Sequence, residues 1–143
     1  MKDKPITFKP FTGKIVKAHF MSWDFVTRSG ATFSAIIYEH NGADVFAADN
    51  NYGNPIAHYW YHKYPNDTLK KLKKFFSNGY ADDGYRIIDG PGWELTLYNS
   101  DGEAFYYNNN GYYGEALALF EKLTSFAYKE MREQDNIKNQ RIY

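Results

Sequence analysis

The sequence contains no cysteine, so a disulfide framework, a cysteine-ligated zinc site and a thiol nucleophile are excluded. It has no run of about 18 apolar residues, the shortest length that indicates a membrane span. The first five residues include three charges and end in proline, and no apolar core of a secretory signal follows them. We therefore expect a cytoplasmic protein without a leader or a membrane segment.

An excess of charge of one sign is also absent. The chain has 17 lysines and arginines against 17 aspartates and glutamates, which gives a formal net charge of zero. This balance disfavours proteins that coat nucleic acid or an acidic membrane, because both tasks depend on a broad positive field. A length of 143 residues fits one domain. We expect a single α+β domain over residues 1–133, with a polar tail or helix extension at residues 134–143.

The first half of the chain is rich in strand signals. Four segments alternate with period two or are enriched in β-branched and aromatic side chains, namely residues 14–20, 31–39, 43–48 and 56–64. Asn41 and Gly42 separate the second segment from the third. Asn-Gly between two apolar runs is the strongest short-range signal of a β-hairpin, because both residues tolerate positive φ. A loop is expected at residues 49–55 from its composition.

The second half of the chain predicts two helices. One covers residues 67–77, with an N-cap at Asn66 or Asp67 and apolar side chains that recur on one face. The other covers residues 115–133, where apolar residues recur at helical spacing.

A second hairpin is predicted between these helices. Residues 93–98 and 103–107 alternate around an Asp-Gly turn, and the asparagines at 108–110 are expected to end the second strand. The order of elements is strands, helix, hairpin and helix. This order predicts an α+β fold with an antiparallel sheet of about five to six strands and two helices packed on one face.

No motif for catalysis stands out. His58 and His62 point to the same face of a strand, but a zinc site needs a third ligand, and we interpret the pair as half-exposed residues on the outer face of the strand. The candidate acid–base carboxylates are Asp82, Asp83 and Asp89, with Glu94 as a further candidate. The three aspartates sit in glycine-containing turns that favour Asp for backbone hydrogen bonding alone. Phosphate-loop, dinucleotide-binding and nucleophile-elbow motifs are absent from the sequence. We expect a non-catalytic protein with no metal and no cofactor.

The most unusual feature that is present is the aromatic content of 20%, which includes 14 tyrosines. Alternate members of an aromatic run on a strand point to opposite faces, so not all of them fit in one core. Exposed Tyr and Trp are typical of interface hot spots. The residues expected to form such an interaction surface are Tyr52, His58, Tyr59, Trp60, Tyr61, His62, Tyr64, Tyr112 and Tyr113.

A second interpretation of the aromatic residues is that they stack on the bases of single-stranded nucleic acid or hold a small ligand in a groove. Lysines would then flank the groove, and the candidates are Lys63, Lys70, Lys71, Lys73 and Lys74. This interpretation requires the helix at residues 67–77 to border the exposed face of the strand at residues 56–64. The simpler interpretation of these lysines is the solvated face of an amphipathic helix.

Residues 89–98 read Asp-Gly-Pro-Gly-Trp-Glu-Leu-Thr-Leu-Tyr, and an Asp-Gly turn, a Gly-Tyr loop and an amphipathic helix follow. This half of the chain, from about Tyr80 onward, resembles a loose group of uncharacterised small bacterial α+β proteins in which a DGxxWxLxxY strand begins a hairpin. The sequence departs from the group at residues 111–114, which lack the proline common there. The resemblance implies a fold and carries no functional residues.

From these observations we expect a non-catalytic intracellular protein-interaction domain, such as an immunity or inhibitor protein of a bacterium or its phage. Its partner is expected to be another protein bound through exposed Tyr and Trp side chains. The chain itself is expected to be a monomer or a small homo-oligomer. The alternative is binding of a small ligand or single-stranded nucleic acid in an aromatic groove flanked by lysines.

Overall fold

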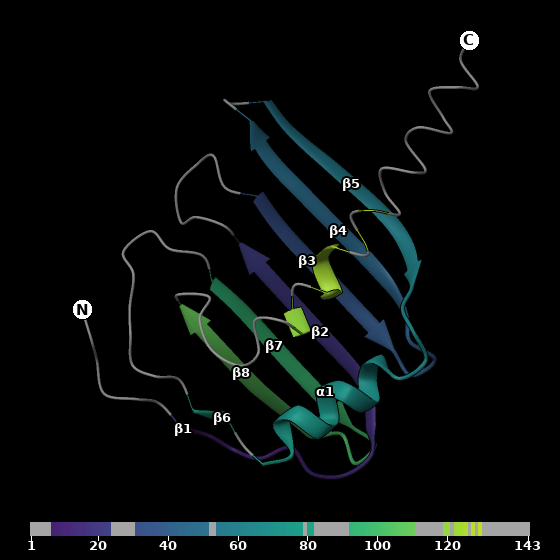
Figure 1. The fold of residues 1–143 in the computed structure, drawn as a ribbon, viewed down its shortest axis with the longest axis vertical. Helices are drawn as coiled ribbons and strands as arrows, with labels where there is room; N and C mark the ends of the chain where they lie inside the picture. The colour runs from purple at the N-terminus through teal and green to yellow at the C-terminus, as the bar shows by residue number, and fades with distance from the viewer. Residues whose placement is uncertain are drawn as a thin grey trace.

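The computed structural model describes residues 7–23, 31–51, 54–78, 80–81 and 92–110, together with 119–120, 122–125, 127 and 129. Six strands form one antiparallel sheet in the order β5-β4-β3-β2-β7-β8 (Figure 1), and β1 pairs with β6 in a small second sheet. The bounds of the elements are β1 Thr7–Phe8, β2 Ile15–Trp23, β3 Ala31–Tyr38, β4 Gly42–Asn51, β5 Asn54–Lys63, α1 Thr68–Phe76, β6 Tyr80–Ala81, β7 Gly92–Asn99 and β8 Ala104–Asn110. The α+β class and the antiparallel sheet are confirmed.

The large sheet is built from two stretches of sequence. Strands β2 to β5 follow one another along the chain and form a meander, while β7 and β8 form a separate hairpin. The two units meet where β7 pairs with β2. The chain must therefore pass from β5, at one edge of the sheet, to the far side of β2, and α1 lies in this connection.

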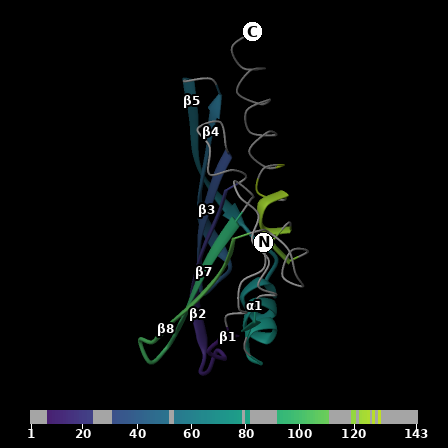
Figure 2. The same cartoon turned by 90° about the vertical axis from the view of Figure 1, so that its left-hand side faces the viewer.

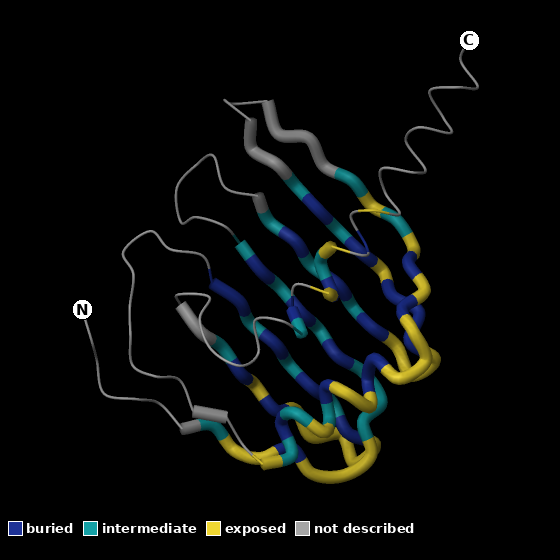
Figure 3. Tube along the Cα trace, in the orientation of Figure 1, coloured by how far each residue is buried: buried dark blue, intermediate teal, exposed yellow. Residues whose placement is uncertain are grey.

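Buried and partly exposed side chains alternate along the central strands (Figure 3). On β2, Phe20 is buried, whereas Lys17 and His19 are half-buried. The register pairs Phe20 with Ala35 of β3 and Leu95 of β7, which are buried as well. The face with the buried side chains also carries α1 (Figure 2), and we call it the helix face. We call the opposite side of the sheet the open face.

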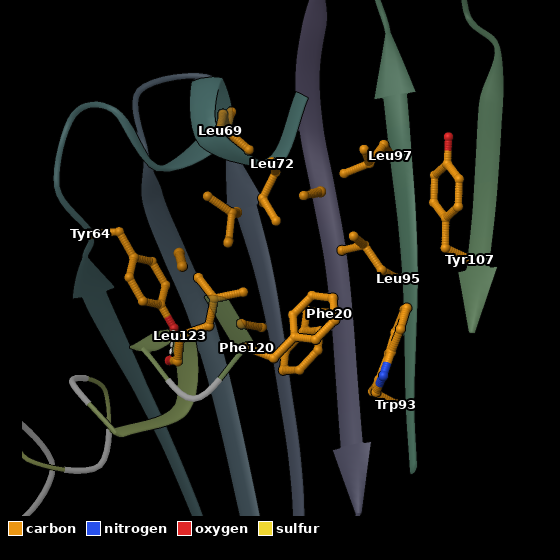
Figure 4. Close-up of a cluster of buried hydrophobic side chains, with 14 of the residues drawn as sticks. Phe20, Tyr64, Leu69, Leu72, Trp93, Leu95, Leu97, Tyr107, Phe120 and Leu123 are labelled. Atoms are coloured by element: carbon orange, nitrogen blue, oxygen red, sulfur yellow. Dashed lines mark hydrogen bonds between the residues drawn. The ribbon is translucent and has the colours of Figure 1, made fainter. Parts of the chain in front are cut away.

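The hydrophobic core lies on the helix face (Figure 4). Leu72 and Phe76 of α1 are fully buried in it. Phe120, from the helical residues near the C-terminus, stacks on Phe20 with ring centroids 4.8 Å apart and lies 4.4 Å from the ring of Trp93. Burial of each such side chain contributes about 1.5–3 kcal/mol. These contacts hold the helical residues and the sheet together.

The first turn of α1 is capped by a side chain from a distant turn. Asp67 occupies the N-cap position, one of the two that were predicted, but its side chain makes no capping hydrogen bond. Instead, Oδ1 of Asn41 accepts a hydrogen bond from the N–H of Leu69 at 2.9 Å, and Nδ2 of Asn41 donates to the carbonyl of Asn66 at 2.9 Å. Asn41 lies in the β3–β4 turn with φ 66°. The hairpin therefore fixes the position where α1 begins.

Two strands extend beyond their predicted ends. Most of the loop expected at residues 49–55 is strand, because β4 continues to Asn51 and β5 begins at Asn54. The asparagines expected to end the last strand pair instead with β7, since Asn108 lies opposite Glu94. Asparagine disfavours strands only weakly, and pairing with a neighbouring strand overrides this preference. The two-residue strands β1 and β6 were not predicted.

Part of the predicted organisation lies outside the described residues. This applies to the polar tail at residues 134–143 and to much of the helix expected at residues 115–133, within which the described residues are helical. Along the part of the chain that the structure describes, every helix is too short or too polar to cross a bilayer.

Candidate interaction face

The open face is a regular grid of outward-pointing side chains. Its middle row crosses the sheet through Tyr61, Asp44, Ile36, His19, Thr96 and Tyr106. One flanking row consists of Tyr59, Phe46, Ser34, Met21, Glu94 and Asn108. The other consists of Lys63, Gly42, Tyr38, Lys17, Tyr98 and Ala104. Among the described residues, α1 and the core lie on the other side of the sheet (Figure 2).

Tyrosines dominate the exposed part of this face. Among the described residues, the large hydrophobic side chains classed as exposed are Tyr59, Tyr61, Tyr106 and Tyr38, with exposed fractions of 79%, 53%, 48% and 38%. All four belong to the open face. Exposed apolar residues that are scattered singly need no explanation, but their concentration on one side of a sheet marks a candidate binding surface.

Contacts within the face hold its β4–β5 side in place. The rings of Phe46 and Tyr59 lie 4.8 Å apart across the strand pair. The hydroxyl of Tyr38 donates to Oδ2 of Asp44 at 2.8 Å, and this hydrogen bond raises the pKa of Tyr38. A Cβ at Gly42 would overlap the hydroxyl of Tyr61. Gly42 therefore leaves the space that the Tyr61 ring occupies.

The β2–β7–β8 side of the face combines aromatic rings with charges. The ammonium of Lys17 lies 4.5 Å from the centroid of the Tyr98 ring. The indole of Trp23 lies over Gly92, where a Cβ would come within 2.6 Å of the ring. Burial raises the pKa of Tyr106, the carboxylate of Glu94 raises it further, and a hydrogen bond with Asn108 opposes the shift. This side of the face is partly shielded from solvent and contains both signs of charge.

His19 lies near the centre of the open face. Its Nε2 is 3.2 Å from Oγ of Ser34 on the neighbouring strand. Burial lowers the pKa of His19, Lys17 lowers it further, and Glu94 opposes the shift. The neutral form of His19 is therefore favoured at pH 7.

The predicted aromatic residues of β5 divide between the two faces of the sheet. Tyr59 and Tyr61 lie on the open face, whereas Trp60 packs against the core on the helix face. Tyr64 is also buried, and its hydroxyl donates to the carbonyl of Leu123 at 2.5 Å. Trp60 and Tyr64 are therefore not part of the exposed surface expected from the sequence, because strand alternation and the register with β4 turn them toward the core.

The two histidines of β5 share a face, but it is the helix face. His58 and His62 lie opposite Ala47 and Ala43, whose side chains are buried, so the interpretation as outer-face residues is corrected. The His62 ring packs edge-on against the Tyr64 ring at 4.4 Å. Within the described residues, no three His, Asp or Glu side chains form a group that could hold a metal ion.

The predicted lysines do not flank the exposed tyrosines as a group. Lys70, Lys71, Lys73 and Lys74 belong to α1 and so lie on the helix-face side of the sheet. Lys71 forms an ion pair with Asp67 at 3.1 Å. Lys63 lies on the open face, where its ammonium donates to the carbonyl of His40. The required contact between α1 and the exposed face of β5 is therefore not formed.

The remaining candidates lie outside the described residues, namely Tyr52, Tyr112, Tyr113, Asp82, Asp83 and Asp89. Sequence reasoning did not include Tyr38, Phe46, Tyr98 and Tyr106 in the interaction surface. The signal that could have found them is strand parity, because each alternates with a core residue on its own strand. Comparison with known proteins gives no matching family model, no matching curated protein and no matching solved structure.

Proposed function

We propose that this chain is a non-catalytic protein-interaction domain, of the immunity or inhibitor kind, that binds a partner protein through the open face. The observation that carries the proposal is the placement of the exposed Tyr38, Tyr59, Tyr61 and Tyr106 on one side of the sheet. In this proposal α1 and the helical residues near Phe120 together cover the helix face (Figure 2). The open face is then available to the partner.

The size of the open face supports a protein partner. Six strands each about 4.8 Å wide and three rows each about 6.8 Å deep cover about 590 Å². A specific interface buries roughly 800 Å² on each partner, so the face can supply most of one. Tyrosine suits such a surface because it offers a large contact area at low conformational cost and a hydroxyl for hydrogen bonding.

The charges on the face favour a protein over nucleic acid. Its three rows hold Lys17 and Lys63 against Asp44 and Glu94, so the charges balance. A phosphate backbone needs an excess of positive charge, whereas a protein surface of mixed polar and apolar character does not. The alternative, a small ligand or single-stranded nucleic acid between aromatic residues and the α1 lysines, has its two sets of residues on opposite sides of the sheet.

The contact between His19 and Ser34 does not favour an enzyme. A serine nucleophile needs backbone donors nearby to stabilise an oxyanion. Ser34 lies on β3, which is hydrogen-bonded to β2 on one side and β4 on the other, so the backbone N–H groups around it are used in the sheet. The flat setting of this pair supports a role in the shape and polarity of a binding surface.

The proposal is tested by capturing a partner from the native host with the full chain and then measuring its affinity by calorimetry. The double variant Tyr59→Ser, Tyr61→Ser is expected to lose at least about tenfold in affinity, because hot-spot tyrosines contribute 2 kcal/mol or more. Lys70→Ser, an exposed change on α1, is the matched control and should leave the affinity unchanged. A partner whose affinity responds to Lys70→Ser and not to the tyrosine variant would overturn the proposal.

The chain itself should be a monomer or a small homo-oligomer that leaves the open face free. Sedimentation velocity on the wild type and on the double tyrosine variant checks this. If the wild type is a dimer that the tyrosine variant converts to a monomer, the open face is occupied by a second copy, and the proposal of a different partner protein is wrong.

A further inference from the structure

A pocket of about 250 Å³ opens between the start of α1 and the helical residues that include Leu119 and Leu123. Its volume matches that of about eight waters, so it suits a small molecule and not a peptide. The pocket lies beside α1, on the other side of the sheet from the exposed tyrosines. What it binds is therefore independent of the function proposed for the open face.

The floor of the pocket is apolar and held in place. Tyr64 and Leu123 are buried and Leu119 is half-buried. The hydroxyl of Tyr64 is already used, because it donates to the carbonyl of Leu123 (Figure 4). This hydrogen bond ties the end of β5 to the helical residues across the pocket, so the floor presents ring and methyl surface to a ligand.

The donors of Thr68 and Leu69 at the start of α1 are also used. The N–H and the hydroxyl of Thr68 both donate to the carbonyl of Pro65, at 3.0 and 2.7 Å. The N–H of Leu69 donates to Asn41. Recognition of a charged ligand group therefore falls to the side chains at the mouth of the pocket.

Those side chains carry a net positive charge, since Lys71 and Lys122 face a single carboxylate, that of Asp67. The hydrogen bond from Lys71 is the main cause that lowers the pKa of Asp67, burial opposes this shift, and the charge of Lys122 is a smaller cause in the lowering direction. The side chains of Lys71 and Asp67 are each more than half exposed. Exposed ion pairs of this kind are weak, so Lys71 can exchange the carboxylate of Asp67 for that of a ligand.

From this arrangement we propose that the pocket binds a small organic anion with an apolar body, such as an aryl carboxylate. The apolar body lies against Tyr64, Leu119 and Leu123, and the carboxylate lies between Lys71 and Lys122. Asp67 competes for the same ammonium groups and repels the ligand. This competition makes the site selective for a single negative charge on a mostly apolar molecule.

Naphthalene-2-carboxylate is a suitable probe, and naphthalene-2-carboxamide is the uncharged control of the same shape. Both are titrated into the full chain by calorimetry and by amide chemical-shift mapping. The carboxylate is expected to bind more tightly than the amide and to weaken as salt is added, because the contacts at the mouth are solvent-exposed. The shifts should centre on the start of α1.

Three charge variants sharpen the test. Lys122→Gln is expected to weaken carboxylate binding about two- to fivefold, and Asp67→Asn to strengthen it by a similar factor. Asp67→Asn removes no helix cap, because the Asp67 side chain makes no capping hydrogen bond. Lys74→Gln, an exposed change on α1 outside the pocket, is the matched control and should have no effect.

Leu119→Trp is a blocking variant that should abolish binding of both probes, with circular dichroism to verify folding. Equal affinity for the carboxylate and the amide would overturn the proposal. So would unchanged affinity in both Lys122→Gln and Asp67→Asn, or chemical shifts that centre on β4 and β5.

Discussion

The side chain of Asn41, in the β3–β4 turn, accepts a hydrogen bond from the backbone N–H of Leu69, 28 residues later in the chain. The same residue is tied to the sheet, because its carbonyl accepts from the N–H of Tyr64 at 2.9 Å and its N–H donates to the carbonyl of Tyr38 at 2.8 Å. One buried asparagine therefore joins the hairpin, the end of β5 and the start of α1.

Replacing Asn41 should separate its two contributions. Asn41→Gly keeps the positive φ but leaves the buried N–H of Leu69 without its acceptor, and we expect a cost of about 1–2 kcal/mol in the free energy of unfolding. Asn41→Ala loses the same hydrogen bonds and also lacks the tolerance of the left-handed region that Asn and Gly have, which adds about 1 kcal/mol. Urea denaturation of both variants measures this. If the two variants lose the same unfolding free energy, the positive φ of residue 41 contributes nothing to stability.

Removal of the Tyr64 hydroxyl tests the link between β5 and the helical residues. Tyr64→Phe leaves the buried carbonyl of Leu123 without this donor, so we expect a loss of about 1 kcal/mol in unfolding free energy. Tyr59→Phe makes the same chemical change on an exposed ring and should stay within about 0.5 kcal/mol of the wild type. Similar losses of unfolding free energy in the two variants would contradict the hydrogen bond between Tyr64 and Leu123.

Truncation of two adjacent residues of β5 should destabilise the protein to very different extents. Trp60→Ala removes a ring packed against the core and should cost about 2–3 kcal/mol, less than for a fully buried aromatic residue. Tyr61→Ala truncates an exposed ring, and its effect on stability should be within about 0.5 kcal/mol. Thermal and urea unfolding provide the measurement. The reverse order would indicate that β5 is shifted by one residue, because such a shift exchanges the two faces.

His19 should make stability depend on pH in a defined direction. Its pKa in the folded protein is below the ordinary value of 6.5, mainly because of burial, so the unfolded chain binds more protons as the pH falls. The stability from neutral His19 is fully present above pH 6.5 and is lost as the pH falls through the lower folded pKa. Relative to His19→Gln, the wild type should therefore lose unfolding free energy between pH 7 and pH 5. A constant difference between the two proteins would contradict the shift.

Turn chemistry made much of the fold predictable. The Asn-Gly hairpin was expected because both residues tolerate positive φ, and Asn41 adopts it with φ 66°. The hairpin expected around Asp-Gly is also formed, and Gly102 in its turn has φ 82°. The helix at residues 67–77 was expected from its apolar spacing and is observed at Thr68–Phe76. These features depend on a few consecutive residues, so a single sequence contains the information.

The orientation of β5 could not be predicted in the same way. Residues 58–62 are all aromatic or histidine, so they offer no contrast between an apolar and a polar side. The face is decided by the register with β4, which places Trp60 opposite the buried Val45 and Tyr61 opposite the exposed Asp44. Of the four exposed tyrosines on the open face, Tyr59 and Tyr61 were among the predicted residues, and Tyr38 and Tyr106 were not.

The pairing of β2 with β7 joins a meander and a hairpin that are each contiguous in sequence. A cut in the chain between Ala81 and Gly92 would leave both units whole, and the two pieces would meet at this ladder and at core contacts such as that of Phe20 with Phe120. Folding of the divided protein would then be an association of two polypeptides, and its rate would rise with concentration. The large sheet is in this sense an intramolecular complex, and its two components are natural fragments for a complementation experiment.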